Sequence, residues 1–145
     1  MKTAQQYIDS LRQRKIKVYL KGQLLDPQTL VDHPFIRGHV ASAALTFELA
    51  HEPESEDLMT AISHLSGNRI NRFTHIHQSV EDLLKKVKML RMISQKTGTC
   101  YQRCVGFDAL NSLYTVTFEM DQALKTDYHQ RFKKFLAYVQ ENDLM

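Results

Sequence analysis

Two cysteines, Cys100 and Cys104, are the residues whose type and spacing could do chemistry, and they are the only cysteines in this sequence of 145 residues. If residues 100–104 formed one helical turn, both sulfurs would lie on one face of the helix, about 6 Å apart. Such a pair could supply two thiolate ligands to a metal ion or an iron–sulfur cluster. It could equally be two buried thiols, which pack as small hydrophobic groups. The spacing alone leaves both interpretations open.

A metal site built on this pair needs further ligands, because structural zinc sites and cubane iron–sulfur clusters usually have four. With no third cysteine in the chain, histidine would have to complete the set. His75 and His77 are two residues apart, so on an extended segment they would share one face. A Cys2His2 zinc site is therefore one hypothesis, although the spacing matches no common zinc module.

Basic residues flank the cysteine pair on both sides. They could bind an anionic partner, such as a phosphate-bearing cofactor or coenzyme A, or they could form the solvated face of a helix. Nucleic acid is not an expected partner, because the aromatic residues nearby fit core stripes better than a stacking platform. The basic residues are Lys85, Lys86, Lys88, Arg91, Lys96 and Arg103.

The composition is that of one globular domain, with 43% hydrophobic and 24% charged residues. A net charge of +3 is too small to indicate a nucleic-acid partner. No apolar run approaches the roughly 20 residues that cross a bilayer, so no membrane partner is expected. The N-terminal residues lack the apolar core of a signal peptide, which predicts a cytoplasmic location.

Capping signals and apolar spacing predict a mainly helical bundle with a little strand. Thr3 and Gln6 form a capping box that opens a helix through about Arg14. Ser79 caps a long helix that runs to about Lys96. The apolar positions of this second helix keep helical spacing, so we expect them to form its buried face. They are Val80, Leu83, Leu84, Val87 and Leu90.

Further helices are predicted over residues 35–50 and 107–124 and from residue 127 onward, with a short acidic turn at 54–59. The helix at 107–124 is apolar on nearly every side, which predicts a central position in the fold. Residues 17–25 predict a small β-hairpin around a Lys-Gly turn. Residues 62–78 are expected to be extended or irregular.

Residues 95–109, Gln-Lys-Thr-Gly-Thr-Cys-Tyr-Gln-Arg-Cys-Val-Gly-Phe-Asp-Ala, closely resemble the 4-hydroxybutyryl-CoA dehydratase/vinylacetyl-CoA Δ-isomerase family. The flavin-dependent members of the wider 4-hydroxyphenylacetate 3-hydroxylase superfamily lack the cysteine pair, so the pair points to the dehydratase branch. The likeness extends along the whole chain. It includes residues 3–12, 31–34, 46–50, 57–60, 71–73, 77–79, 85–89 and 140–144.

The resemblance implies a helical bundle like the N-terminal domain of the acyl-CoA dehydrogenase-like fold. Enzymes of this family are lyases and isomerases that use FAD and a 4Fe-4S cluster to convert 4-hydroxybutyryl-CoA, an acyl-CoA substrate, to crotonyl-CoA. Three cysteines and one histidine hold the cluster in the family. Cys100 and Cys104 match the first two cysteine ligands. Arg91 and Gln102 match residues that the family places at the substrate side of the cluster.

The family's enzymes also contain a β-domain and a C-terminal helical domain, which carry most of the FAD site and the remaining cluster ligands. We therefore expect residues 1–145 to be a single helical N-terminal domain without these two domains. By itself it would bind neither cofactor and would be inactive as an enzyme. It would be either a truncated gene product or one piece of a split enzyme, whose companion chain would carry the missing domains. We expect it to form a homo-oligomer, as the family's enzymes do.

Two other functions stay open at this point. The chain could be a component of a flavin-dependent 4-hydroxyphenylacetate 3-monooxygenase-like enzyme, against which the cysteine pair argues. It could also be a non-catalytic helical domain that binds a partner through an exposed apolar face.

Overall fold

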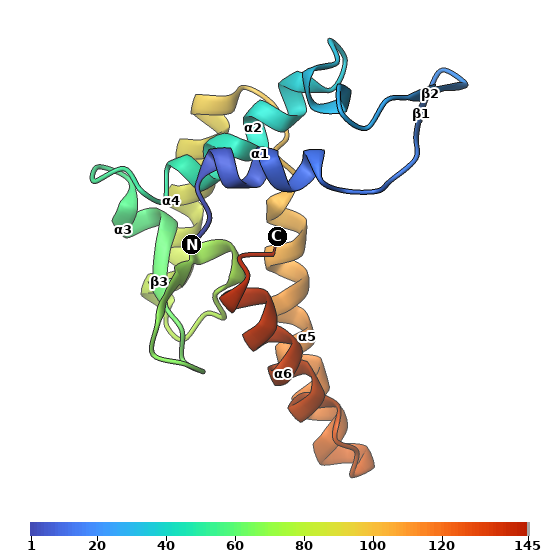
Figure 1. Ribbon diagram of the computed structural model, residues 1–145. Helices are drawn as coiled ribbons and strands as arrows, with labels where there is room; N and C mark the ends of the chain where they lie inside the picture. Colours follow the sequence, from blue (N-terminus) through green and yellow to red (C-terminus); the bar gives the residue numbers. More distant parts are fainter. Residues whose placement is uncertain (145) are drawn as a thin grey trace.

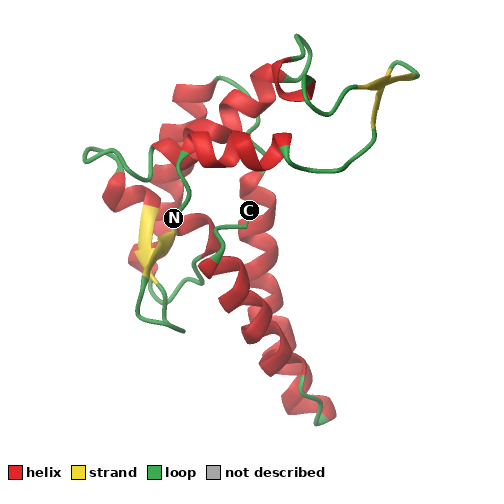
Figure 2. Cartoon of the chain, in the orientation of Figure 1, coloured by secondary structure: helices red, strands yellow, loops and turns green. Residues whose placement is uncertain are grey.

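The computed structural model describes residues 1–144, which form six α-helices, two antiparallel β-hairpins and two 3-10 turns (Figures 1 and 2). The mainly helical fold class is thus confirmed, and no helix in this part of the chain is long and apolar enough to span a membrane. The helices are α1 (Ala4–Arg12), α2 (Arg37–Glu48), α3 (Glu56–Met59), α4 (Val80–Thr97), α5 (Arg103–Leu124) and α6 (Tyr128–Glu141). The strands are β1 (Val18–Leu20), β2 (Gln23–Leu25), β3 (Thr60–Ile62) and β4 (Arg69–Asn71), and the 3-10 turns are η1 (Leu30–Asp32) and η2 (Arg72–Thr74).

Helix α1 begins at the predicted capping box and packs against α2. The Thr3 side chain accepts a hydrogen bond from the Gln6 backbone, and the Gln6 side chain accepts one from the Thr3 backbone. Tyr7 of α1 stacks on Phe47 of α2, with 4.7 Å between ring centroids. The β1–β2 hairpin is also confirmed, and it extends away from the helices in Figure 1.

A second hairpin lies where the sequence predicts only extended or irregular chain. Strand β3 pairs with β4, with Thr60 opposite Asn71 and Ile62 opposite Arg69. Strands of three residues are too short to show an alternating pattern, so the sequence alone could not reveal their pairing. Buried polar contacts hold the hairpin in place: Ser63 donates to the Gln140 side chain of α6 at 2.7 Å.

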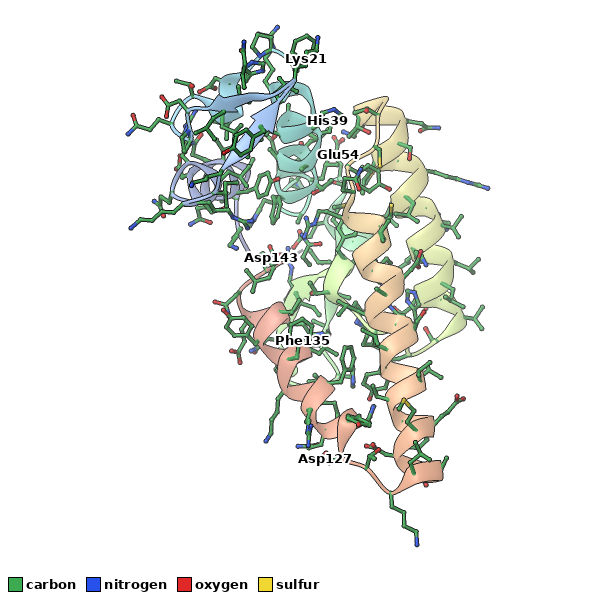
Figure 3. All side chains as sticks on the ribbon, turned by 90° about the vertical axis from the view of Figure 1, so that its right-hand side faces the viewer. Lys21, His39, Glu54, Asp127, Phe135 and Asp143 are labelled. Atoms are coloured by element: carbon green, nitrogen blue, oxygen red, sulfur yellow. The ribbon has the colours of Figure 1, made fainter. Side chains whose placement is uncertain are left out.

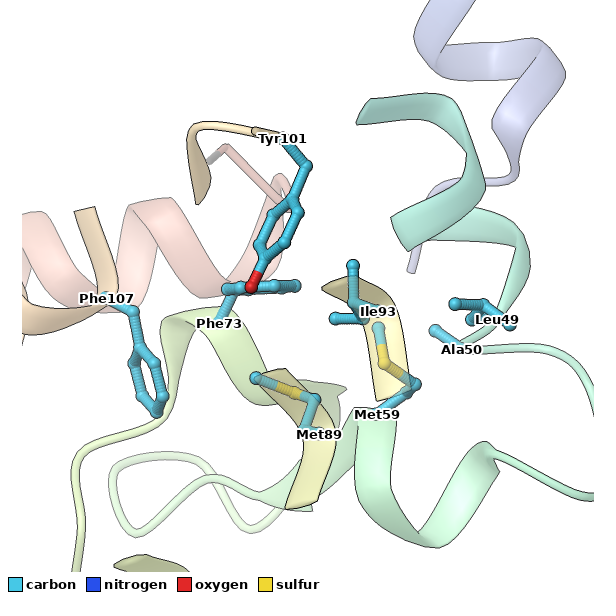
Figure 4. Packing of buried hydrophobic residues seen from close by; sticks show 8 residues of the cluster. All are labelled: Leu49, Ala50, Met59, Phe73, Met89, Ile93, Tyr101 and Phe107. Atoms are coloured by element: carbon cyan, nitrogen blue, oxygen red, sulfur yellow. The ribbon is translucent and has the colours of Figure 1, made fainter. Parts of the chain in front are cut away.

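The main core lies between α2, α3, α4 and α5, below the segment that joins α4 to α5 (Figure 4). It consists of Leu49, Ala50, Met59, Phe73, Met89, Ile93, Tyr101 and Phe107. A second buried cluster joins α5 to α6 and consists of Ile76, Leu110, Phe132, Leu136 and Val139.

The expected buried face of α4 is wrong for four of its five residues and right for Leu90, which is partly buried and packs against the main core. Val80 is 73% exposed and Leu84 57% exposed, and Leu83 and Val87 are exposed as well. Met89 and Ile93, near the other end of the helix, are its fully buried residues. The spacing of apolar residues identifies the apolar face of a helix. It does not show which turns of that helix pack against another element of the fold.

The central position predicted for the helix at 107–124 holds only for the first part of α5. Phe107 and Leu110 are buried, whereas Leu113, Val116 and Phe118 are exposed. Figure 1 shows the reason: the later turns of α5 run beside α6 and extend together with it from the rest of the molecule.

Candidate functional site

The two cysteines do not share a helical turn, because the chain breaks between α4 and α5. Gly98 ends α4 with a φ of +61°, and Gln102 precedes α5 with a φ of +65°. Cys100 is therefore an exposed residue of the connecting loop, and Cys104 is a partly buried residue in the first turn of α5. Both are free thiols. The Thr-Gly-Thr sequence at 97–99 is the local signal for this break, since glycine is the usual residue after a helix end.

Tyr101 anchors the loop between the two cysteines. Its side chain is buried in the main core, and its ring meets the ring of Phe73 edge-on at 6.0 Å. Its neighbours Cys100 and Gln102 are exposed. The loop is thus fixed at one buried point while the residues on either side of that point face outward.

Arg103 is buried, which corrects the interpretation of the basic residues as one solvated face. Its guanidinium lies between the rings of Phe47 and Phe73, at 4.0 and 4.5 Å from their centroids. It donates to Thr46 Oγ1 at 2.9 Å and to Asp143 Oδ1 at 3.2 Å. Burial lowers the pKa of Arg103 to about 10, and the Asp143 carboxylate opposes that shift. Arg103 therefore stays charged at neutral pH.

The other basic residues lie on α4, and several are paired with carboxylates. Lys85 lies 2.7 Å from Asp57, and Lys96 lies 3.8 Å from Glu52. Lys86 is paired with Asp108 of α5. Arg91 is one of the two residues that the resemblance places at the substrate side of the cluster. It is exposed and forms no ion pair with the residues that the structure describes.

A cavity of about 440 Å³ lies between α1, α2 and the segment from Cys100 to Gly106. Of the four predicted site residues, Cys100 and Gln102 line it, whereas Cys104 and Arg91 do not. Sequence reasoning missed the α1 and α2 residues of this cavity, because nothing in the sequence indicates that these helices meet the cysteine loop. The lining consists of Tyr7, Leu11, Arg14, His39, Val40, Ala43, Phe47, Cys100, Tyr101, Gln102, Arg103 and Gly106.

The hypothesis of a Cys2His2 zinc site is wrong. His75 Nε2 lies 3.3 Å from Asp82 Oδ2, and the His77 ring packs against Phe107 at 4.9 Å. Burial lowers the pKa of both histidines. Residues 1–144 contain no group of three or more His, Cys, Asp or Glu side chains that could hold a metal ion. Cys100 and Cys104 are free thiols, a ligand type that iron–sulfur clusters use, but they are not grouped with a third candidate ligand among these residues.

With this fold and site, the chain belongs to the family described as 4-hydroxyphenylacetate 3-hydroxylase N terminal, whose model matches residues 3–145. This match confirms the superfamily expected from residues 95–109.

Within the family, the chain is similar to dehydratases and, more distantly, to monooxygenases. It is 50% identical over 143 residues to the 4-hydroxybutyryl-CoA dehydratase/vinylacetyl-CoA-Δ-isomerase of Clostridium aminobutyricum, covering 99% of this chain and 29% of that protein. An oxygen-tolerant archaeal 4-hydroxybutyryl-CoA dehydratase from N. maritimus has a matching structure with a TM-score of 0.91 and 48% identity, over 97% of this chain and 27% of that one. The oxygenase component (HpaB) of 4-hydroxyphenylacetate 3-monooxygenase shares the fold, with a TM-score of 0.70 at 20% identity, over 99% of this chain and 29% of that one. The chain thus spans less than a third of the length of these relatives.

Proposed function

We propose that residues 1–145 are the N-terminal helical domain of an enzyme of the 4-hydroxybutyryl-CoA dehydratase/vinylacetyl-CoA isomerase type, built on the acyl-CoA dehydrogenase-like fold. The observation that carries the proposal is the 50% identity to such an enzyme along nearly the whole chain. The placement of both cysteines at one loop and the adjoining helix start supports it. The domain acts on an acyl-CoA only together with a β-domain and a second helical domain, supplied by the same polypeptide or by a companion chain.

In this proposal Cys100 and Cys104 hold two positions of a 4Fe-4S cluster. Thiolates are the usual ligands of such clusters. The family resemblance implies that the other two ligands, one cysteine and one histidine, come from outside residues 1–145. When bound, the cluster and FAD supply the electron-transfer chemistry by which water is removed. The structure supports the assignment because both thiols are free and neither is fully buried.

Two residues of this chain position the substrate in the proposal. The exposed guanidinium of Arg91 attracts an anionic part of the acyl-CoA. The Gln102 amide can both donate to and accept from a substrate hydroxyl or carbonyl. Gln102 holds a φ of +65°, a conformation that is costly for a residue with a β-carbon.

The exposed apolar residues of α4 and α5 support a larger assembly. Val80, Leu83, Leu84 and Val87 lie on α4, and Leu113 and Val116 on α5. Contiguous exposed apolar surface commonly marks an interaction site. We assign these residues to contacts with the remainder of the enzyme or with another subunit of a homo-oligomer.

The test is reconstitution. Residues 1–145 are co-expressed with the segment of the C. aminobutyricum relative that follows its matched region, and the complex is loaded with iron, sulfide and FAD without oxygen. Crotonyl-CoA formation from 4-hydroxybutyryl-CoA is then measured. We expect activity from the complex and none from residues 1–145 alone. Cys104→Ser lowers both iron content and activity at least tenfold, whereas the control Thr99→Ser in the same loop changes neither. A loaded, folded complex without dehydratase activity contradicts the proposal.

A monooxygenase component is the second candidate, favoured by the shared fold with HpaB. It predicts that the reconstituted complex hydroxylates 4-hydroxyphenylacetate with reduced flavin and oxygen, and that Cys104→Ser leaves this activity intact. A non-catalytic interaction domain, the third candidate, predicts neither activity but a complex that still forms through the exposed apolar residues of α4 and α5.

A further inference from the structure

The β1–β2 hairpin carries an exposed apolar pair next to two lysines. Tyr19 lies opposite Leu24 in the register, and their side chains are 63% and 55% exposed. Lys17 is two residues before Tyr19, and Lys21 is two residues after it, at the turn. No residue of either strand is buried, and an isolated two-stranded hairpin is marginally stable in water. We therefore expect another surface to cover this hairpin face, which consists of Lys17, Tyr19, Lys21 and Leu24.

The chain that forms the hairpin is strongly basic. Residues 10–25 contain five Lys or Arg and no Asp or Glu. Arg14, Lys15, Lys17 and Lys21 form no ion pair with the residues that the structure describes. A partner surface that carries carboxylates is therefore favoured.

The segment that joins α2 to α3 has the opposite charge. Residues 48–57 contain five Asp or Glu, and residues 38–68 contain no Lys or Arg. Within this segment Pro53 is exposed between Glu52 and Glu54, which we call the acidic loop. Glu54 forms no ion pair in the part of the chain that the structure describes, and Glu52 meets only Lys96, at 3.8 Å in a solvent-accessible pair of little energetic value. An apolar ring between two carboxylates complements a tyrosine between two lysines.

The hairpin face and the acidic loop cannot meet within one molecule. In Figure 1 the hairpin extends on the right, whereas α3 and the loop before it lie on the left. Figure 3 labels Lys21 on the hairpin and Glu54 on the acidic loop. Two copies related by a two-fold axis could bring the surfaces together twice, because such an interface uses the same two surfaces from both copies.

We propose that the hairpin face docks on the acidic loop of a second copy of this chain. The Tyr19 ring packs on Pro53 of the partner subunit, and the two lysines beside Tyr19 pair with the two glutamates beside that proline. The interaction goes beyond the proposed function, since it involves neither the cysteines nor the residues assigned to the substrate.

The test measures self-association of residues 1–145 by sedimentation over a range of concentrations. We expect a concentration-dependent dimer that weakens at least fivefold from low to high ionic strength, because salt screens ion pairs at the rim of an interface. Carbodiimide, which joins lysine to a nearby carboxylate, should link peptides that contain Lys17 or Lys21 to the peptide that contains Glu52 and Glu54. Mass spectrometry should find this link in the dimer and not in the monomer.

Charge reversal on each side gives a matched design. The hairpin variant combines Lys17→Glu with Lys21→Glu, and the loop variant combines Glu52→Lys with Glu54→Lys. Each variant alone should dimerise at least tenfold more weakly, because like charges then face each other. In a mixed dimer of the two variants both contacts again join opposite charges, so the equimolar mixture should recover the association of the wild type.

The control variant combines Lys125→Glu with Lys134→Glu. It changes the net charge as much as the hairpin variant does, at exposed residues far from the hairpin in sequence, and should leave self-association unchanged. Circular dichroism shows whether each variant folds, and the cross-link in the wild-type chain tests the contact even if a variant does not fold.

The proposal is overturned if the chain stays monomeric at millimolar concentration, if the cross-link is absent from the dimer, or if the mixed variants do not recover. It is also overturned if the control weakens association as much as the hairpin variant does. A hairpin variant that self-associates normally but no longer binds the remaining segment of the C. aminobutyricum relative shows instead that the enzyme's other domains cover the hairpin. None of these measurements depends on dehydratase activity, so the contact and the proposed function can fail separately.

Discussion

Replacing Asp143 with alanine should destabilise the protein strongly, because it leaves the Arg103 charge buried without a counter-ion. Arg103 is 5% exposed and Asp143 is 4% exposed. Removal of one partner of a buried ion pair costs about 3–5 kcal/mol. The Asp143 carboxylate also accepts from the Lys2 backbone N–H at 3.0 Å, so the change frees the N-terminal segment as well (Figure 3 labels Asp143 at the end of α6).

The assay is thermal and urea unfolding followed by circular dichroism. For a chain of this length, 1 kcal/mol corresponds to about 4 °C in the midpoint, so Asp143→Ala should lower it by about 10–20 °C. Asp127→Ala is the control, since Asp127 pairs with Arg131 on α6 with both side chains largely exposed (65% and 68%). An exposed pair of this kind contributes less than about 1 kcal/mol.

The double variant Arg103→Met with Asp143→Ala gives a second measurement. The double variant removes the buried charge together with its partner. Its loss in free energy of unfolding should therefore be at least about 1 kcal/mol smaller than the sum of the losses of the two single variants. Since Arg103 stands next to Cys104, Asp143→Ala should also speed alkylation of Cys104. If Asp143→Ala and Asp127→Ala lower stability equally, then Arg103 is solvated and the reasoning about its burial is refuted.

Three further predictions concern pH, backbone conformation and the exposed apolar face. Burial opposes ionisation of Asp82, but the Gln78 backbone N–H, His75 and Arg72 lower its pKa to about 2. Its stabilisation, on the order of 2 kcal/mol, is therefore present above the ordinary pKa of 3.8 and lost as pH falls through about 2. Urea unfolding should show Asp82→Asn less stable than wild type at pH 7 and equal to it below pH 2. Gly98→Ala should lower the free energy of unfolding in urea by about 1 kcal/mol, because residue 98 has a left-handed backbone conformation. The added methyl group has no atom within 4 Å, so a clash adds nothing to this cost. A variant as stable as wild type would contradict this expectation. Leu84→Glu should leave the free energy of unfolding within about 0.5 kcal/mol of wild type, because Leu84 is exposed. The same change should weaken assembly of the reconstituted complex, measured by size-exclusion chromatography. Unchanged assembly would show that Leu84 is not part of the interface.

The sequence predicts well those features that depend on neighbouring residues. The Thr3–Gln6 capping box opens α1 as expected, and Ser79 caps α4 as expected. The β1–β2 hairpin follows from a turn at Lys21 and Gly22, both with positive φ. The family follows from residues 95–109 and is confirmed by the match over residues 3–145. Cap and turn hydrogen bonds join residues a few positions apart, so the local sequence contains the information.

Only the tertiary structure decides how the site residues are arranged. Residues 100–104 look compatible with one helical turn, but the buried Tyr101 and the left-handed Gln102 separate Cys100 from Cys104. Arg103 looks like one more surface cation, yet its partners Thr46 and Asp143 are 57 and 40 residues away in sequence. Burial and ion pairing depend on which segments distant in sequence contact each other. The periodicity of the local sequence contains no information about such contacts. The role of the cysteine pair as cluster ligands stays a prediction from resemblance. The placement of Cys100 and Gln102 in one cavity with α1 and α2 is what the fold adds.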